Sequence, residues 1–274
     1  MKLYEDIQVR SLTTISLCTV LALTGCASST MNSATGVDRK QLLLVSSDEV
    51  NQMAAQSYQQ TLTEARQKGI LNPNAAQLQR LQRIANRLIP QVNVYRPDAR
   101  NWNWQVNMIK SNELNAYCAP GGKIMFYTGI IDRLNLTDDE IAAIMGHEMA
   151  HALREHGRER VSRGSATQLG LSVLASAVGL TEGQTQIAGI ATQLGLDLPF
   201  SRSQESEADS LGLELMARAG YNPQAAISLW NKMSAASQGE PPQFLSTHPG
   251  AQNRIQHLQS LIPKVTPLYQ QAKR

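Results

Sequence analysis

Two histidines four residues apart, His147 and His151, stand in the stretch GHEMAH. Residues at this spacing lie on one face of an α-helix, so the two imidazoles could bind the same metal ion. Glu148 is rotated by about 100° from His147 on such a helix. Its carboxylate would then lie beside the ion and could take a proton from a water that the ion activates. The stretch predicts either a zinc site with its own general base or a solvated helix face with two incidental histidines.

A catalytic zinc needs a third protein ligand and an open position. No further histidine lies at the close downstream spacing of the metzincins, but the stretch SRSQESEAD offers Glu205, Glu207 and Asp209. Glu205 and Asp209 are four apart and share a helix face, whereas Glu207 points elsewhere. Glu205 could bind the ion while Asp209 accepts the outer N–H of a ligand histidine. Alternatively, these carboxylates mark the start of a polar helix, where the helix dipole favours them.

The helix that must carry the histidines is well marked in LTDDEIAAIMGHEMAHALREHG. Thr137 and Glu140 match a capping box, and Gly157 is expected to end the helix. Two short helices are expected in residues 165–198. Apolar spacing and capping residues predict further helices over 46–69, 72–92, 203–220 and 222–233, the last with Asn222 as its cap, and another after Pro249.

Strand signals are confined to one part of the chain. WNWQVNMI (102–109) alternates between apolar and polar residues, as a strand does. ELNAYCAP and KIMFYTGI flank Gly121 and Gly122, which predicts a hairpin. We therefore expect an α+β fold that is mainly helical, with one small antiparallel sheet.

Composition narrows the possible functions. The 274 residues suffice for one large domain with appendages. A net charge of +3, without a basic stripe, gives no reason to expect nucleic-acid binding. Cys118 would be the only thiol of the folded domain, so no disulfide is expected within it; we interpret it as a small, half-buried apolar residue.

The N-terminus has the features of a targeting segment. Residues 11–23 form an apolar run that is too short to span a bilayer comfortably but fits a signal peptide. The following LTGC resembles the bacterial lipobox, which implies cleavage before Cys26 and lipidation of its sulfur. Ala27, a non-acidic residue after that cysteine, implies sorting to the outer membrane. Because residues 1–10 lack a net positive charge, an uncleaved anchor or a chance apolar run remains the alternative.

Three motifs occur together in a specific order: HEMAH, then SRSQESEAD, then STHPGAQNRI. In this combination the sequence resembles the lipoprotein and membrane zinc metallopeptidases of the HtpX, Ste and Oma type, in particular the periplasmic lipoprotein proteases of the LoiP and BepA type. The resemblance covers about residues 46–265. It implies a zincin-like metallopeptidase domain with one Zn²⁺ per chain.

The resemblance also assigns roles to single residues. It implies that Glu205 is the third zinc ligand and that Asp209 supports a ligand histidine. His248 would lie near the metal, where it could cap the fourth position or donate to the oxyanion. Arg254 would support the reacting carbonyl. We expect the two remaining histidines, His156 and His257, to lie at the surface.

The resemblance implies a membrane-anchored endopeptidase that cleaves misfolded or stalled envelope proteins at the periplasmic face of the outer membrane. The hairpin around Gly121 would be its substrate-side edge, since extended peptides bind proteases by adding a strand. The expected segments are a signal peptide (1–25), a lipidated flexible tether (26–45), the metallopeptidase domain (46–265) and a tail (266–274).

Two other functions remain open at this point. One is a chaperone or assembly factor for outer-membrane proteins whose zinc stays capped by His248 and serves folding. The complete motif disfavours it, because a structural zinc site has no need of Glu148. The other is a helical cell-wall-binding lipoprotein, which would bind no metal. The sequence does not name the substrate or the oligomeric state.

Overall fold

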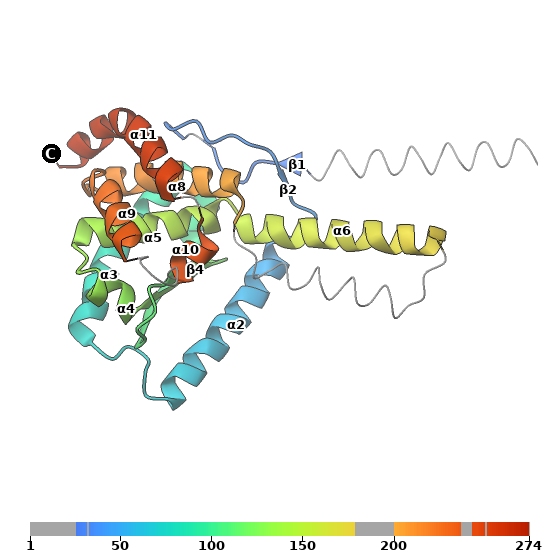
Figure 1. The fold of residues 1–274 in the computed structure, drawn as a ribbon, viewed down its shortest axis with the longest axis horizontal. Coiled ribbons are helices and arrows are strands. Elements are labelled where there is room, and N and C mark those ends of the chain that lie inside the picture. The colour runs from blue at the N-terminus through green and yellow to red at the C-terminus, as the bar shows by residue number, and fades with distance from the viewer. Residues whose placement is uncertain (1–25, 32, 179–199, 237–242, 250, 274) are drawn as a thin grey trace, which may run out of the picture.

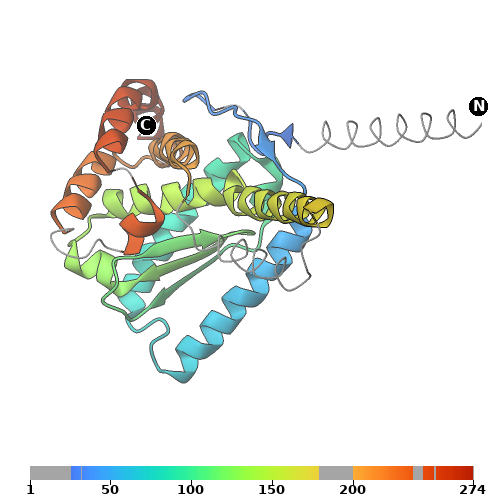
Figure 2. The ribbon, with the colours of Figure 1, turned by 45° about the vertical axis from the view of Figure 1, so that its right-hand side comes forward.

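A three-stranded sheet forms one layer of the domain, and helices cover it (Figures 1 and 2). The computed structural model describes residues 26–31, 33–178, 200–236, 243–249 and 251–273. The sheet has the strand order β3 (Gln105–Ile109), β5 (Lys123–Tyr127) and β4 (Ala116–Ala119). Helices make up most of the rest, so the predicted α+β, mainly helical class is confirmed.

The sheet is mixed rather than antiparallel. β4 and β5 form the predicted hairpin, with Gly121 and Gly122 at positive φ in its turn. β3, however, pairs with β5 in parallel, so the prediction of a purely antiparallel sheet is wrong. Alternating side chains indicate a strand but not the direction of its neighbour. The almost fully buried β5 is the central strand, which leaves β4 at an edge.

α5 (Asp138–Leu153) runs through the domain and is buried along almost its whole length. The capping box of Thr137 and Glu140 begins it, as predicted. Its main neighbours are α8 (Arg202–Arg218), β4 and α9 (Ala225–Ala235). The histidine motif therefore lies on a helix that is enclosed by the fold.

Two glycines let α5 and α8 meet at their backbones. A Cβ added to Gly146 would lie 2.9 Å from the carbonyl oxygen of Gly212. A Cβ added to Gly212 would lie 2.7 Å from the backbone nitrogen of His147. Any larger side chain would force the helices apart, because real Cβ contacts are not this short. The glycines thus bring the histidines of α5 within reach of the carboxylates of α8.

α5 ends earlier than predicted. Its last helical residue is Leu153, Glu155 has a φ of 51°, and α6 (His156–Val178) begins directly afterwards. The predicted end at Gly157 is therefore wrong, since a left-handed glutamate has no strong sequence signal. The turn leaves the side chains of Arg154 and His156 fully buried.

The other predicted helices are present with small shifts. α9 begins after Gln224, because Asn222 forms a turn by accepting a hydrogen bond from the Gln224 amide. α11 continues through the expected tail. The remaining elements are β1 (Cys26–Ala27), β2 (Gln41–Leu42), α2 (Ser47–Gln67), α3 (Ala75–Leu88), η1 (Ile89–Val94), η2 (Pro97–Asn101), α4 (Thr128–Arg133), α10 (Gln243–Thr247) and α11 (Ala251–Ala272).

The chain between Cys26 and α2, expected to be a flexible tether, lies against the domain. β1 and β2 pair in antiparallel fashion, and Arg39 forms ion pairs with Glu159 and Glu207. A composition rich in Ser and Thr indicates a flexible segment. Composition alone does not show that the folded domain offers polar side chains with which this segment can form hydrogen bonds and ion pairs. The structure does not describe the predicted signal peptide (1–25), the side chain of Cys26 or residues 179–198 of the two expected short helices.

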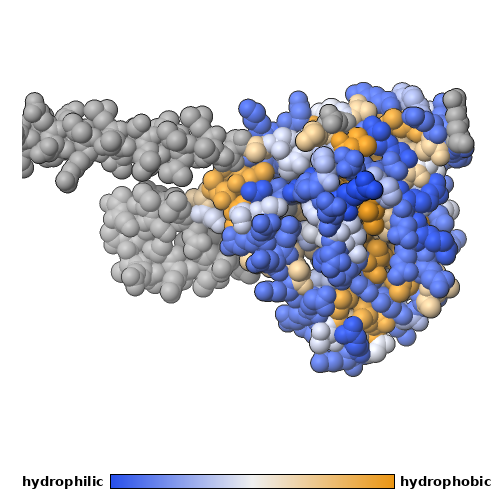
Figure 3. Space-filling view, turned by 180° about the vertical axis from the view of Figure 1, so that it is seen from behind, coloured by the Kyte–Doolittle hydropathy of each residue, from blue (hydrophilic) through white to orange (hydrophobic). Residues whose placement is uncertain are grey.

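The face seen in Figure 3 is mostly hydrophilic, with apolar side chains in a narrow band between blue regions and in a second patch beside the grey residues. Within the described ranges, no helix combines the length and the hydropathy of a bilayer-spanning segment. The apolar residues are mainly inside, in one large cluster around α5 and the sheet.

Candidate metal centre

Four buried side chains point their donor atoms at one place. His147 and His151 come from α5, Glu205 from α8, and His248 from the chain just after α10, and their ligand atoms all lie within 4.8 Å of one another. The two Nε2 atoms of His147 and His151 are 3.1 Å apart. Nδ1 of His248 lies 3.3 Å from Nε2 of His147 and 3.0 Å from Oε1 of Glu205. This is the cluster that the sequence pattern and the family resemblance predicted.

The protonation states of the donors suit a cation. Burial lowers the pKa of His147 to about 4 and that of His151 well below its usual value, so both imidazoles are neutral. Burial alone would raise the pKa of Glu205, but hydrogen bonds with His151 and His248 and the charge of Arg254 hold it well below its usual range. Neutral imidazoles and an ionised carboxylate are the forms that bind metals.

One unsatisfied atom supports the argument for a metal. Oε1 of Glu148 is buried without a hydrogen-bond partner, a state that native structures rarely leave unexplained. Three imidazoles and a carboxylate are a donor set that zinc accepts in tetrahedral geometry. The residues present therefore fit a zinc ion.

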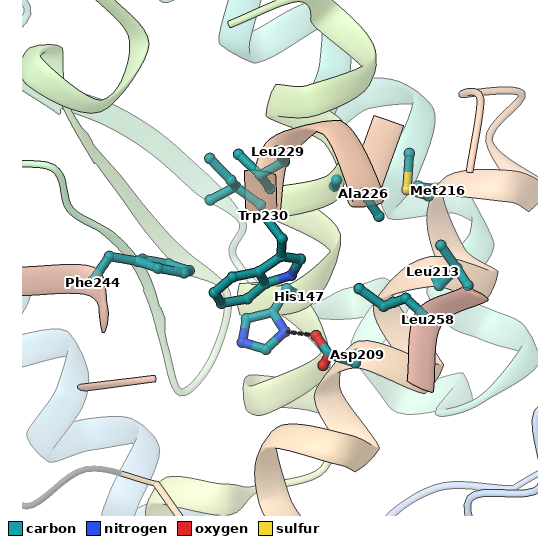
Figure 4. Close-up of a pocket in the computed structure, with 11 residues that line it drawn as sticks. His147, Asp209, Leu213, Met216, Ala226, Leu229, Trp230, Phe244 and Leu258 are labelled. Carbon is teal, nitrogen blue, oxygen red and sulfur yellow. Dashed lines mark ion pairs between the residues drawn. The ribbon is translucent and has the colours of Figure 1, made fainter. Parts of the chain in front are cut away.

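Asp209 lies on the far side of His147 from the other donors. Its Oδ1 is 3.2 Å from Nδ1 of His147, as the dashed line in Figure 4 marks. A carboxylate at this nitrogen orients the ring and leaves Nε2 for the ion. Beside it, Trp230 and Phe244 line a small apolar cavity of about 20 Å³.

Arg254 contacts the carboxylates of the centre. Its Nε donates to Oδ2 of Asp209 at 2.7 Å, and its Nη1 lies 2.5 Å from Oε2 of Glu205. The guanidinium also stacks on Trp230, 3.9 Å from the ring centre. Arg254 is not among the described residues that line the neighbouring cleft, so its support of a reacting carbonyl stays a prediction.

Glu148 lies between the donors and an open cleft. It is 3% exposed, and burial raises the pKa of its carboxyl to about 7. A backbone hydrogen bond with Cys118 on β4 opposes this rise in pKa. Oε1 of Glu148 has no hydrogen-bond partner and lies 3.4 Å from Nε2 of His248.

The cleft beside Glu148 has a volume of about 600 Å³. One wall is the β4 edge, residues 115–120, and the opposite wall includes His151, Phe200 and His248. The ring of Phe200 packs on that of His151 with 3.9 Å between centres. Cys118, in the β4 wall, is buried rather than half-buried as expected.

His156 was expected at the surface, and the structure corrects this. It is 0% exposed, and its Nδ1 lies 2.8 Å from Nδ1 of His151. This contact was not predicted because the helix was expected to continue to Gly157. On such a helix, a residue five positions after His151 would be turned about 140° away from it. The turn at Glu155 brings the ring back. His257 is half-buried and hydrogen-bonds the hydroxyls of nearby serines.

The chain is similar in sequence to known proteins. A family model described as peptidase family M48 matches residues 75–262. The mitochondrial metalloendopeptidase OMA1 of Schizosaccharomyces pombe is 34% identical over 163 residues, covering 59% of this chain and 47% of that protein. Two metalloproteases of Escherichia coli also match: LoiP is 29% identical over 252 residues (89% of this chain, 93% of LoiP), and YcaL 24% over 218 residues (74% and 82%).

The chain spans about half the length of the mitochondrial OMA1 relative, but nearly all of LoiP. The family match includes the donors on α5, α8 and after α10 as well as Arg254. With the family model covering well over half of its residues, the chain belongs to peptidase family M48.

Proposed function

We propose that the protein is a zinc-dependent endopeptidase of the bacterial envelope that cleaves misfolded or stalled proteins. The observation that carries the proposal is the position of Glu148. Its unpaired Oε1 lies next to three histidines and a carboxylate, and it faces a cleft with an edge strand on its other side. A structural metal site has no use for such a group.

Each side chain has a distinct task in hydrolysis. His147, His151 and Glu205 would hold a zinc ion, which when bound would supply Lewis-acid activation of water and of a peptide carbonyl. Glu148 takes the proton of the attacking water at Oε1 and delivers it to the leaving amine. His248, 3.4 Å from Oε1 of Glu148, is in position to donate to the oxyanion.

The β4 edge provides a place for the substrate backbone. Among the residues that the structure describes, β4 pairs only with β5 in its sheet, so the other side of this strand could pair with an extended peptide. The residues of that edge line the same cleft as Glu148. An extended, unfolded chain is the substrate that such an edge accepts most readily.

The proposed location rests on the N-terminus. Residues 11–23 resemble a signal peptide and Cys26 stands where lipobox cysteines are modified. A lipid anchor at Cys26 would attach the domain to the outer membrane, on its periplasmic side.

Chelation tests the proposed activity. The full chain in detergent is incubated with an unfolded test protein, with and without a chelator, and fragments are identified by mass spectrometry. We expect internal cleavage that the chelator abolishes and added zinc restores. Cleavage that continues in the metal-free protein would contradict the proposal.

A second candidate is an assembly factor or chaperone with a silent metal site. His248 favours it, because Nδ1 lies 3.0 Å from Oε1 of Glu205 and within the ligand cluster, where it could fill the open position. His248→Ala separates the two functions. A gain in cleavage would indicate a protease restrained by this histidine, whereas zinc without cleavage in both proteins would favour the chaperone.

A further inference from the structure

A buried chain of hydrogen bonds leads from His151 away from the metal centre. Nε2 of His151 faces the other donors, while its Nδ1 lies 2.8 Å from Nδ1 of His156. Nε2 of His156 lies 3.0 Å from Oε2 of Glu207. The two histidines and the carboxylate therefore form one continuous path.

Glu207, at the end of this path, determines which ring nitrogens of His156 and His151 carry protons. Glu207 is ionised because it forms ion pairs with both Arg39 and Arg154. An ionised carboxylate only accepts hydrogen bonds, so Nε2 of His156 must donate to it. Nδ1 of neutral His156 is then bare and accepts the N–H of His151. This leaves the lone pair of His151 Nε2 directed at the metal position.

Glu207 is held in turn by two arginines, Arg154 and Arg39, and Arg39 belongs to the segment that follows the predicted lipid anchor. Arg154 donates to Oε2 of Glu207 from Nε and Nη2, both at 3.0 Å. Arg39 bonds the other oxygen of Glu207 and reaches Glu159 at 2.7 Å. Gln41, two residues on, donates to the backbone carbonyl of Arg154 at 2.6 Å.

We propose that His156 is a positioning residue of the metal centre, aligned by Glu207, and that Arg39 makes the membrane-proximal segment part of this support. The proposal rests on the proposed zinc site. His147 has the familiar single carboxylate, Asp209, at its outer nitrogen. His151 instead has a second histidine between itself and its carboxylate, and this places a segment about 110 residues earlier in the chain within the same network.

Zinc affinity is the primary test, measured on the full chain in detergent by competition with a chromophoric chelator. His156→Phe keeps the ring volume but removes the acceptor, and we expect a loss of about 10–100-fold in affinity. His156→Asn can place an amide oxygen near the position of Nδ1, so it should retain most of the affinity. The visible spectrum of the Co²⁺-substituted protein should change in His156→Phe, because the orientation of His151 changes.

α8 offers a matched control for general destabilisation. Glu207 and Glu214 are both buried glutamates of this helix that bind the N-terminal segment, Glu214 through Ser33 and Thr35. Only Glu207 contacts His156. We expect Glu207→Gln to weaken zinc binding and Glu214→Gln to leave it unchanged. Arg39→Gln should weaken binding less than Glu207→Gln does.

The outcomes separate this inference from the proposed function. Wild-type zinc affinity and an unchanged Co²⁺ spectrum in a folded His156→Phe protein would overturn the inference but not the protease. Equal losses in Glu207→Gln and Glu214→Gln would also overturn it, because they would indicate a general effect on folding. Tight zinc binding without peptide cleavage in the wild type would overturn only the proposed function, and a wild type that binds no zinc would overturn both.

Discussion

Glu205 has the most demanding environment at the centre. It is 1% exposed, its Oε1 is bonded to His248, and Arg254 lies at its Oε2. An anion buried this deeply needs compensating charge. One arginine and an ion provide that charge, and the arginine is shared with Asp209.

Glu205→Gln should therefore release the metal. A neutral amide is a poor zinc ligand, and the loss should exceed the roughly 10–100-fold effect of an outer partner. Metal analysis after gel filtration measures the zinc that remains. Glu214→Gln, another buried position of α8, serves as the control. Full zinc occupancy in Glu205→Gln would show that Glu205 is not a ligand.

At the scale of elements, the site depends on the α5–α8 contact. The histidines and the carboxylates belong to different helices, which the Gly146–Gly212 pair brings into backbone contact. No local sequence pattern predicts such a pair, since a glycine inside a helix ordinarily lowers the stability of that helix.

Gly212→Ala should separate the helices. Its Cβ would lie 2.7 Å from the backbone nitrogen of His147, and overpacking of this kind costs about 1–3 kcal/mol. We expect a lower midpoint of thermal unfolding together with weaker zinc binding. The control is Gly164→Ala in α6, where a Cβ meets nothing within 4 Å; it should add about 0.5–1 kcal/mol of stability. Unchanged stability and zinc binding in Gly212→Ala would contradict this account.

The junction of α6 with the N-terminal segment should make stability depend on acid pH. Burial alone would raise the pKa of Glu159, but hydrogen bonds from Arg39, Gln41 and Gln204 lower it to about 2. Its usual value is 4.5. A depressed carboxylate contributes stability that is present above the usual pKa and is lost as the pH falls from about 4.5 towards 2.

Glu159→Gln removes this contribution. Denaturant unfolding with a chelator present, repeated from pH 6 to pH 2.5, should show a shallower decline of the free energy of unfolding in the variant than in the wild type. Parallel declines would mean that Glu159 has the same pKa in the folded and unfolded chain.

At the scale of the whole molecule, the features that could be predicted from the sequence are those set by residues close together in the chain. The cap of α5 and the hairpin turn depend on residues a few positions apart, so their patterns are legible. Helix periodicity and the family resemblance predicted that Asp209 supports a ligand histidine, but not that this histidine is His147. The parallel partner of β5, the turn at Glu155 and the burial of His156 depend on distant chain segments, and no local pattern predicts them.

The N-terminal segment links that fold to the proposed anchor. Cys26→Ser removes the sulfur that would carry the lipid, so we expect the variant to leave the membrane fraction. Outer-membrane and soluble fractions of a host with two membranes can be compared by immunoblot. Equal membrane association of wild type and variant would contradict lipidation at Cys26.

The most direct test of the central claim is Glu148→Gln, assayed for zinc content and for cleavage of an unfolded protein in the same sample. Glu148 is not a ligand here, so we expect full zinc occupancy. We also expect cleavage to fall by about 10²–10⁴-fold, the usual contribution of a general base. Cleavage at the wild-type rate by a zinc-loaded Glu148→Gln protein would contradict the claim that Glu148 is the proton acceptor of this site.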